Sequence, residues 1–250
     1  MPTTCVSSLP IVEHQDWDER KPKPGGPPFA NASLAGSYAF GSSADTNVSV
    51  AGAKTVGRFT AGGDGTISAG AFDSVEDGTP LTNISFTGTY SMASNGRATV
   101  TLNPSTGTIQ QIFWMVSPSR AFFLTSDRNK VEDGTVDLQQ PITFSNSAMK
   151  GQFAVLMDGF DPVNLVDRVG TLQWDGAGNL TLDEFINRSG TTQTPGLISG
   201  TYSVASNGRA SGAISGLSNN LVFYLISGSD GYILQNDTGT EIDGMMSKQP

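Results

Sequence analysis

The strongest constraint on the fold is an internal duplication. Residues 88–98 read GTYSMASNGRA and residues 200–210 read GTYSVASNGRA, identical at ten of eleven positions. Weaker matches continue on both sides, and the spacing between matched segments changes only from 115 to 109 residues. Copies that keep the same order are expected to share one topology. The sequence therefore predicts two equivalent units, at 34–141 and 148–250, after an N-terminal arm at 1–33.

Within each unit the side chains alternate between apolar and polar. In the segment NISFTGTYSMA, Ile84, Phe86, Tyr90 and Met92 fall on one face, and serines and threonines fall on the other. A period of two is typical of strands with one buried face. We therefore expect Tyr90 and its counterpart Tyr202 to point inward at equivalent positions.

Tight turns separate these strands. The Asn-Gly pairs at 95–96 and 207–208 predict hairpins with type I′ turns, in which both central residues have positive φ. Eight short antiparallel strands favour a closed meander barrel in each unit, because closure removes exposed sheet edges. A two-sheet β-sandwich is the alternative within the same all-β class. In the first unit the strands are expected at 36–43, 55–61, 66–73, 83–93, 97–103, 109–117, 120–126 and 134–139.

One hairpin in each unit breaks the alternation. The segments 109–116 with 121–124, and 221–226 with 232–234, are apolar on both faces. A strand that is apolar on both faces is usually covered on both sides. We expect these hairpins to pack barrel against barrel within the chain, and an oligomer interface is the alternative.

Composition excludes several classes of partner and site. With 14 basic and 23 acidic residues, the chain lacks the clustered Lys and Arg that nucleic acids or anionic membranes require. No apolar run approaches the ~18 residues of a membrane helix. A single Cys and a single His (His14) exclude an intrachain disulfide, a multi-cysteine metal site and most triad chemistry. The acidic turn cluster Asp73, Glu76 and Asp77 lacks calcium-loop spacing and is interpreted as solvated. No metal and no cofactor are expected.

The order of turn and core residues resembles a repeat of predicted exported proteins from acidobacteria. That repeat has a G-x-Y/F-x-F strand, a glycine-rich hairpin and then T-G-T-Y-x-x-x-x-N/D-G-R-G/A. The matching residues of the first unit are Gly36, Tyr38, Phe40, Gly57, Phe59, Gly65, Ile67 and the segment from Gly88 to Ala98. The second unit carries Leu172 where the pattern prefers Phe. The architecture is also similar to lipocalin-like and avidin-like barrels.

The resemblance implies a fold and a location but no chemistry, because these proteins have no established activity. It implies an extracytoplasmic protein, secreted or on the cell surface. No signal peptide is visible in the first thirty residues of the chain.

Glu184 is the most informative carboxyl of the predicted strands. Aligning the units places it opposite Ala71 on an inward face, where a carboxyl would have a raised pKa and could act as acid, base or ligand anchor. A one-residue bulge would instead turn Glu184 outward and leave Phe185 inside. The bulge is the favoured interpretation.

Four aromatic residues complete the candidate ligand site. Trp114 and Trp174 could line a cavity, although core packing is the favoured role for both. Tyr90 and Tyr202 would face the same interior. The predicted ligand is a small apolar molecule.

The arm at 1–33 combines five prolines from Pro10 onward with a short apolar stretch. Its candidate assembly residues are Leu9, Ile11, Val12 and Trp17. They are too few to form a core but sufficient for docking, so we expect the arm to contact another copy of the protein.

Three functions agree with this sequence. The leading one is a non-catalytic, extracytoplasmic structural or surface protein that self-associates, with its arm as the candidate contact. The alternatives are a barrel that binds a small apolar ligand, and an enzyme that works by cavity shape, such as a lipocalin-like cyclase.

Overall fold

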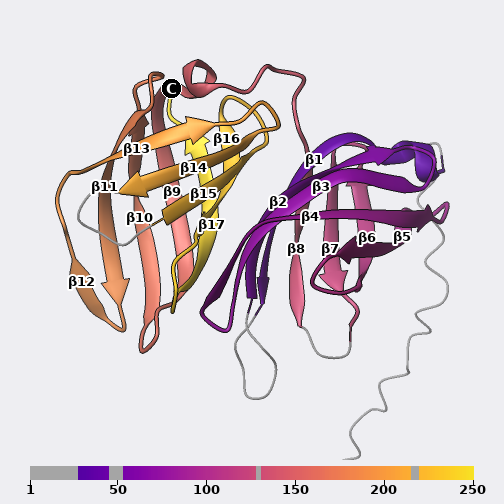
Figure 1. Cartoon of the computed structure of the whole chain (residues 1–250), viewed down its shortest axis with the longest axis horizontal. Helices are drawn as coiled ribbons and strands as arrows, with labels where there is room; N and C mark the ends of the chain where they lie inside the picture. Colours follow the sequence, from indigo (N-terminus) through magenta and orange to yellow (C-terminus); the bar gives the residue numbers. More distant parts are fainter. Residues whose placement is uncertain (1–27, 45–52, 128–130, 215–219) are drawn as a thin grey trace, which may run out of the picture.

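The chain forms two antiparallel barrels side by side (Figure 1). The structure is a computed structural model, and it describes residues 28–44, 53–127, 131–214 and 220–250. The all-β prediction is confirmed, and closed barrels replace the sandwich alternative. Within the described ranges, no helix has the length and apolarity needed to cross a membrane.

Barrel 1 is a meander in which each strand pairs with the next and β1 pairs with β8 to close the ring. Its strands are β1 (Ala35–Ala44), β2 (Ala53–Gly62), β3 (Thr66–Glu76), β4 (Thr79–Met92), β5 (Arg97–Pro104), β6 (Ile109–Ser117), β7 (Arg120–Thr125) and β8 (Glu132–Leu138).

Barrel 2 repeats this topology. Pairing of β9 with β17 and of β10 with β11 closes its ring, and β12 is a short extra strand on β11. Its strands are β9 (Gly151–Phe160), β10 (Leu165–Trp174), β11 (Asn179–Arg188), β12 (Thr191–Gln193), β13 (Ile198–Val204), β14 (Arg209–Ile214), β15 (Asn220–Leu225), β16 (Asp230–Gln235) and β17 (Glu241–Lys248).

Aromatic side chains fill the interior of barrel 1. Tyr38 stacks on Phe59 with ring centroids 5.5 Å apart, and Phe113 lies 5.6 Å from Phe123. Phe40 meets Phe123 edge to face. Such rings contribute large apolar area and favour tilted or offset contacts. The interior of barrel 1 is therefore a packed core.

A tyrosine ties a short 3-10 helix across one end of each barrel. In barrel 1, Tyr90 donates to the carbonyl of Leu34, 2.6 Å away, just after the helix η2 (Asn31–Ser33). In barrel 2, Tyr202 donates to the carbonyl of Asn146, 3.1 Å away, in the helix η3 (Asn146–Met149). Both tyrosines are buried at equivalent positions, as the period-two register predicts.

The Asn-Gly turns differ from the prediction. Gly96 and Gly208 have positive φ, of 88° and 86°, but Asn95 and Asn207 do not. The amide of Ala93 donates to the carbonyl of Arg97, which makes a three-residue loop with glycine in the left-handed region. The type I′ prediction is wrong, because a three-residue loop is commonly a type I turn followed by a residue in the left-handed region.

Candidate functional site

The two barrels meet through an apolar cluster that is separate from both interiors. It joins Ala39, Val56 and Val75 on the outside of barrel 1 to the hairpin β15–β16 of barrel 2. The hairpin contributes Val222, Tyr224, Tyr232 and Leu234. This contact confirms, for the second unit, that the hairpin apolar on both faces packs barrel against barrel. In Figure 1 the amber hairpin β15–β16 and the yellow strand β17 (Glu241–Lys248) are on the side of barrel 2 that faces β2.

A buried carboxylate organises the polar part of this interface. Asp73 on β3 is 0% exposed, and it accepts hydrogen bonds from Arg209 Nε at 2.8 Å and Arg209 Nη2 at 2.7 Å. The Tyr224 hydroxyl donates to it at 2.8 Å, and the backbone N–H of Asn83 donates at 3.0 Å. Both carboxylate oxygens of Asp73 thus accept hydrogen bonds. The two side chains that donate them, those of Arg209 and Tyr224, belong to barrel 2. The interpretation of Asp73 as a solvated turn residue is wrong.

These contacts change the proton affinity of their members. Burial and the nearby Asp73 raise the pKa of Tyr224. Hydrogen bonding to Asp73 raises the pKa of Arg209. Both groups therefore keep their protons at physiological pH, and Arg209 carries the charge that balances Asp73.

A second ion pair lies on the other side of the interface. Lys54 Nζ on β2 is 2.8 Å from Asp243 and 3.6 Å from Asp158, both in barrel 2. Burial raises the pKa of Asp243 to about 6, although Lys54 opposes that shift. The Asp243 side chain therefore takes up a proton at a higher pH than an exposed aspartate does.

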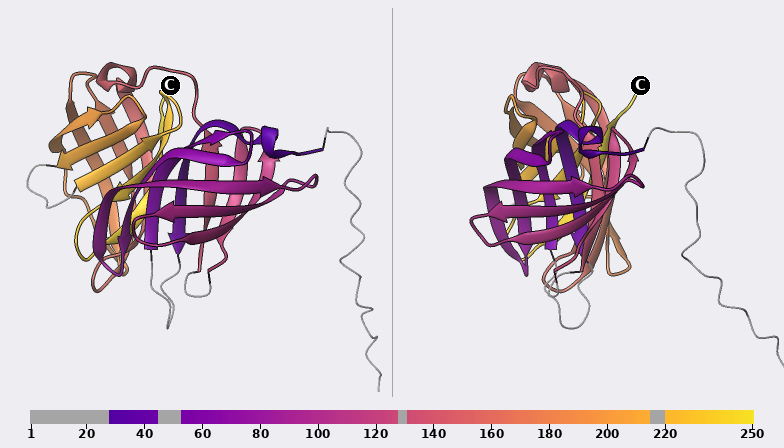
Figure 2. Two further views of the ribbon diagram at one scale, coloured as in Figure 1. Left: turned by 45° about the vertical axis from the view of Figure 1, so that its right-hand side comes forward. Right: turned by 90° about the vertical axis from the view of Figure 1, so that its right-hand side faces the viewer.

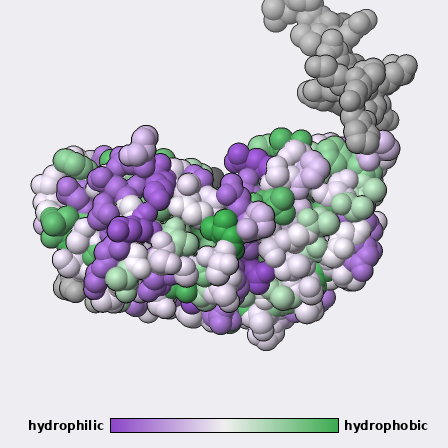
Figure 3. Space-filling view, turned by 90° about the horizontal axis from the view of Figure 1, so that it is seen from above, coloured by the Kyte–Doolittle hydropathy of each residue, from purple (hydrophilic) through white to green (hydrophobic). Residues whose placement is uncertain are grey.

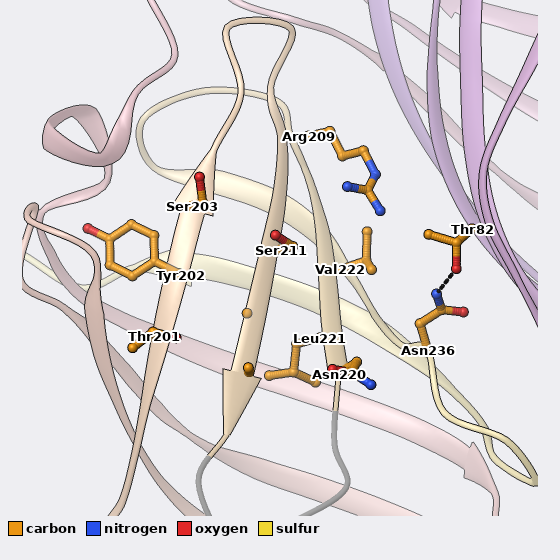
Figure 4. Close-up of a pocket in the computed structure, with 12 residues that line it drawn as sticks. Thr82, Thr201, Tyr202, Ser203, Arg209, Ser211, Asn220, Leu221, Val222 and Asn236 are labelled. Carbon is orange, nitrogen blue, oxygen red and sulfur yellow. Dashed lines mark hydrogen bonds between the residues drawn. The ribbon is translucent and has the colours of Figure 1, made fainter.

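Two grooves flank the interface, and both lie outside the barrels. The first, of about 410 Å³, follows the outer surface of β13, β14 and β15 and reaches barrel 1 at Thr82. Figure 4 shows Asn236 donating across the junction to the Thr82 hydroxyl, 2.8 Å away. The second, of about 280 Å³, lies between β1 and β8 of barrel 1 and β9, β16 and β17 of barrel 2. Seen from above, the molecule has two lobes whose surface mixes apolar and hydrophilic residues (Figure 3).

The interior of barrel 2 contains an ion pair. Arg168 Nη1 on β10 lies 3.8 Å from Glu184 Oε2 on β11, and the two side chains are 6% and 2% exposed. Glu184 Oε1 and Arg168 Nε have no hydrogen-bond partner within the protein. Burial raises the pKa of Glu184, and Arg168 opposes this shift. A second pair lies near it, with Arg188 Nε on β11 2.8 Å from Asp161 Oδ2.

The bulge lies in the other unit, which reverses the prediction for Glu184. In barrel 1 the register of β3 against β4 shifts between Ile67 and Gly70, and Ala69 has φ 49°. Strand β11 alternates without interruption, so Glu184 points inward and Phe185 is 56% exposed. A bulge adds one residue and exchanges the faces beyond it. Glu184 therefore occupies the register position of Phe72 in barrel 1.

The tryptophans have opposite environments. Trp174 is fully buried, with its ring centroid 4.3 Å from that of Tyr202 and 4.9 Å from that of Phe223. Trp114 points outward and is 50% exposed, because its neighbour Phe113 takes the inward position. The favoured core-packing role and the alternative of lining a cavity are therefore both wrong for Trp114, whereas core packing is confirmed for Trp174. A ligand-binding role for Trp174, Tyr90 and Tyr202 stays a prediction.

Other predicted groups are not placed. Leu9, Ile11, Val12, Trp17 and His14 lie outside the described residues. Among the residues that are described, no group of three or more His, Cys, Asp or Glu side chains is arranged to hold a metal ion.

Comparisons with known proteins add little to this picture. Protein-family models and curated proteins gave no match. Among solved structures, kievitone hydratase from Nectria haematococca is similar, with 8% identity and a TM-score of 0.27 over 87% of this chain and 90% of that one. A DUF3598-family protein of unknown function from Nostoc punctiforme has 11% identity and a TM-score of 0.27 over 87% and 97%. At these scores neither likeness indicates a function for this chain.

Proposed function

We propose that the protein is a non-catalytic structural protein that acts outside the cytoplasm by self-association. The resemblance of its repeat to predicted exported proteins supports the location. The packed aromatic interior of barrel 1 and the fully buried Trp174 in barrel 2 favour a structural role over one that requires a large internal cavity.

The observation that carries the proposal is the position of the exposed apolar residues. On barrel 1 they gather on the outer face of β6 and β7, where Trp114, Val116, Phe122 and Leu124 are each about half exposed. On barrel 2 they gather on β9, β10, β11 and β17. Patches of adjacent apolar side chains on a soluble protein typically mark sites of protein association.

The direct test is a concentration series of the full chain by multi-angle light scattering. Self-association predicts that the mean mass rises with concentration across the micromolar range. A mass that stays at 26.1 kDa throughout would contradict the proposal.

A second candidate function is supported by one observation. The unpartnered atoms Glu184 Oε1 and Arg168 Nε inside barrel 2 favour a small ligand with a polar group at that position. Native mass spectrometry of the protein purified from its producing cells tests this idea. A bound mass that is lost in the double variant Arg168→Leu, Glu184→Leu would support it, and a spectrum of bare chain alone would contradict it.

A further inference from the structure

The contact between the barrels joins two different kinds of surface. Barrel 2 contributes the outer face of its hairpin β15–β16, which we call the hairpin face. Barrel 1 contributes the outer face of β1, β2 and β3, which we call the three-strand face. The contact is therefore heterologous. It leaves the apolar side chains on the hairpin face of barrel 1 and on the three-strand face of barrel 2 about half exposed, although Asp158 at the edge of the latter already pairs with Lys54.

The unused hairpin face of barrel 1 has the same residue pattern as the used one. Trp114 lies opposite Phe122 across β6 and β7, as Tyr224 lies opposite Tyr232 across β15 and β16. Leu124 extends the patch along β7. The aromatic pair is thus buried in barrel 2 and half exposed in barrel 1.

The unused three-strand face of barrel 2 carries a continuous apolar row. Met245 pairs with Leu156, Leu156 with Val169, and Val169 with Phe185, so the row crosses four adjacent strands. All four side chains are more than half exposed. Val169 has the register position of Val56, which is fully buried in the contact within the chain.

The two unused faces differ from the two used faces by a pair of substitutions at positions that would touch each other. Within the chain, the Tyr224 hydroxyl donates to Asp73. At the equivalent positions of the unused surfaces, Trp114 replaces Tyr224 and Phe185 replaces Asp73. A hydroxyl–carboxylate pair in one contact thus corresponds to a pair of aromatic rings in the other, and Arg97 takes the position of Arg209 beside them.

From this correspondence we infer that the hairpin face of barrel 1 docks on the three-strand face of barrel 2 in a second copy of the chain, repeating the geometry of the contact within the chain. The inference rests on the proposed self-association and specifies its surfaces. In each ring the centres of the used and unused faces are about half a turn apart, with β6 opposite β2 and β11 opposite β16, whereas their edges adjoin at β8 and at β17. The left panel of Figure 2 shows the barrels as two bodies that meet along one side of each. A heterologous contact between opposite ends continues from copy to copy as an open filament.

One charged position opposes this contact. Asp167 takes the position of Lys54, and Asp133 takes that of Asp243, so two exposed carboxylates would meet where the chain itself has an ion pair. Salt screens such repulsion between exposed charges. Association is therefore expected to strengthen with ionic strength, and Asp167→Lys is expected to strengthen it at low salt.

A mixing experiment with two surface variants tests the inference. Trp114→Glu disables the hairpin face of barrel 1, and Phe185→Glu disables the three-strand face of barrel 2. Each variant alone is expected to associate at least roughly 30-fold more weakly than the wild type, as is typical of a central aromatic contact. Mixed in equal amounts, they are expected to form a one-to-one dimer and nothing larger, because one intact face of each kind remains free to pair. Sedimentation velocity measures these species.

Leu197→Glu is the matched control, because Leu197 is a highly exposed apolar residue that belongs neither to the Met245–Phe185 row nor to the patch on β6 and β7, and it should associate like the wild type. Circular dichroism melts verify that the variants fold. If the wild type is monomeric, the proposed self-association fails and the inference fails with it. If the wild type associates but Phe185→Glu associates equally well, or the mixture stays monomeric, self-association stands and the inferred pairing of faces is overturned.

Discussion

We expect that replacing Asp73 with alanine weakens the contact between the two barrels and so destabilises the protein. The change removes the acceptor for two hydrogen bonds from Arg209 and one from Tyr224. The guanidinium is left largely buried, with its side chain only 19% exposed. Removing one partner of a buried ion pair typically costs about 3–5 kcal/mol, because the remaining charge is uncompensated. We expect Asp73→Ala to lower the free energy of unfolding by that amount.

A double-mutant cycle isolates this contact. Arg209→Met should cost a similar amount, because Asp73 is fully buried, whereas the double variant should cost much less than the sum of the two. Urea unfolding followed by tryptophan fluorescence supplies the free energies. Asp183→Ala is the matched control, since that carboxyl is exposed on barrel 2 and its removal should change stability by less than about 0.5 kcal/mol. Additive effects, or a cost for Asp73→Ala below about 1 kcal/mol, would show that the barrels do not dock through these residues in solution.

Three further predictions follow from the interiors, the interface and the turns. Arg168→Leu should destabilise the protein by about 3–5 kcal/mol in urea unfolding, because it leaves the buried Glu184 carboxyl without its partner. Adding Glu184→Leu should recover most of this loss, because the pair is buried and incompletely hydrogen-bonded. A double variant less stable than the single one would refute this. The pKa of Asp243 is raised to about 6 from an ordinary value of 3.8, so the folded state binds the proton more tightly and this group's contribution to stability should fall by roughly 2–3 kcal/mol as pH rises from 4 to 6. Asp243→Asn should remove that part of the slope in unfolding curves measured across this range, and an unchanged slope would exclude the assignment. Gly208→Val should lower stability by about 1–3 kcal/mol, because its φ is 86° and an added Cβ would lie 2.6 Å from a buried amide. Gly107→Val should cost less, since no atom lies within 4 Å of its added Cβ, and equal shifts in melting temperature would contradict the steric part.

The fold was predictable because the duplication and the period of two are local properties of the sequence. Tyr90 and Tyr202 illustrate this, since their inward positions depend only on strand alternation. The type I′ assignment failed because the Asn-Gly pair occurs in several hairpin loops. Only the pairing of Ala93 with Arg97 distinguishes them, and it depends on strand register.

The environment of Glu184 was not predictable from its own strand. The position of a bulge decides which face a residue takes, and the bulge lies at Ala69 in the other unit. The partner Arg168 is on the neighbouring strand, opposite Ile186, so its proximity to Glu184 follows from the register of β10 against β11.

The role of Asp73 and the different environments of the two apolar hairpins depend on tertiary structure. Both hairpins have the same apolar pattern, but two barrels in one chain form a single contact between a hairpin and the neighbouring barrel. The hairpin with Tyr224 is covered, and the hairpin with Trp114 is not. Nothing in either segment alone indicates which of the two will be used.

Electron microscopy of the concentrated protein tests the central claim most directly, because the proposed contact between copies repeats the contact within each chain. We expect unbranched strings of barrel-sized bodies with one uniform spacing throughout. Isolated two-lobed particles, or closed particles of fixed size, would contradict the account.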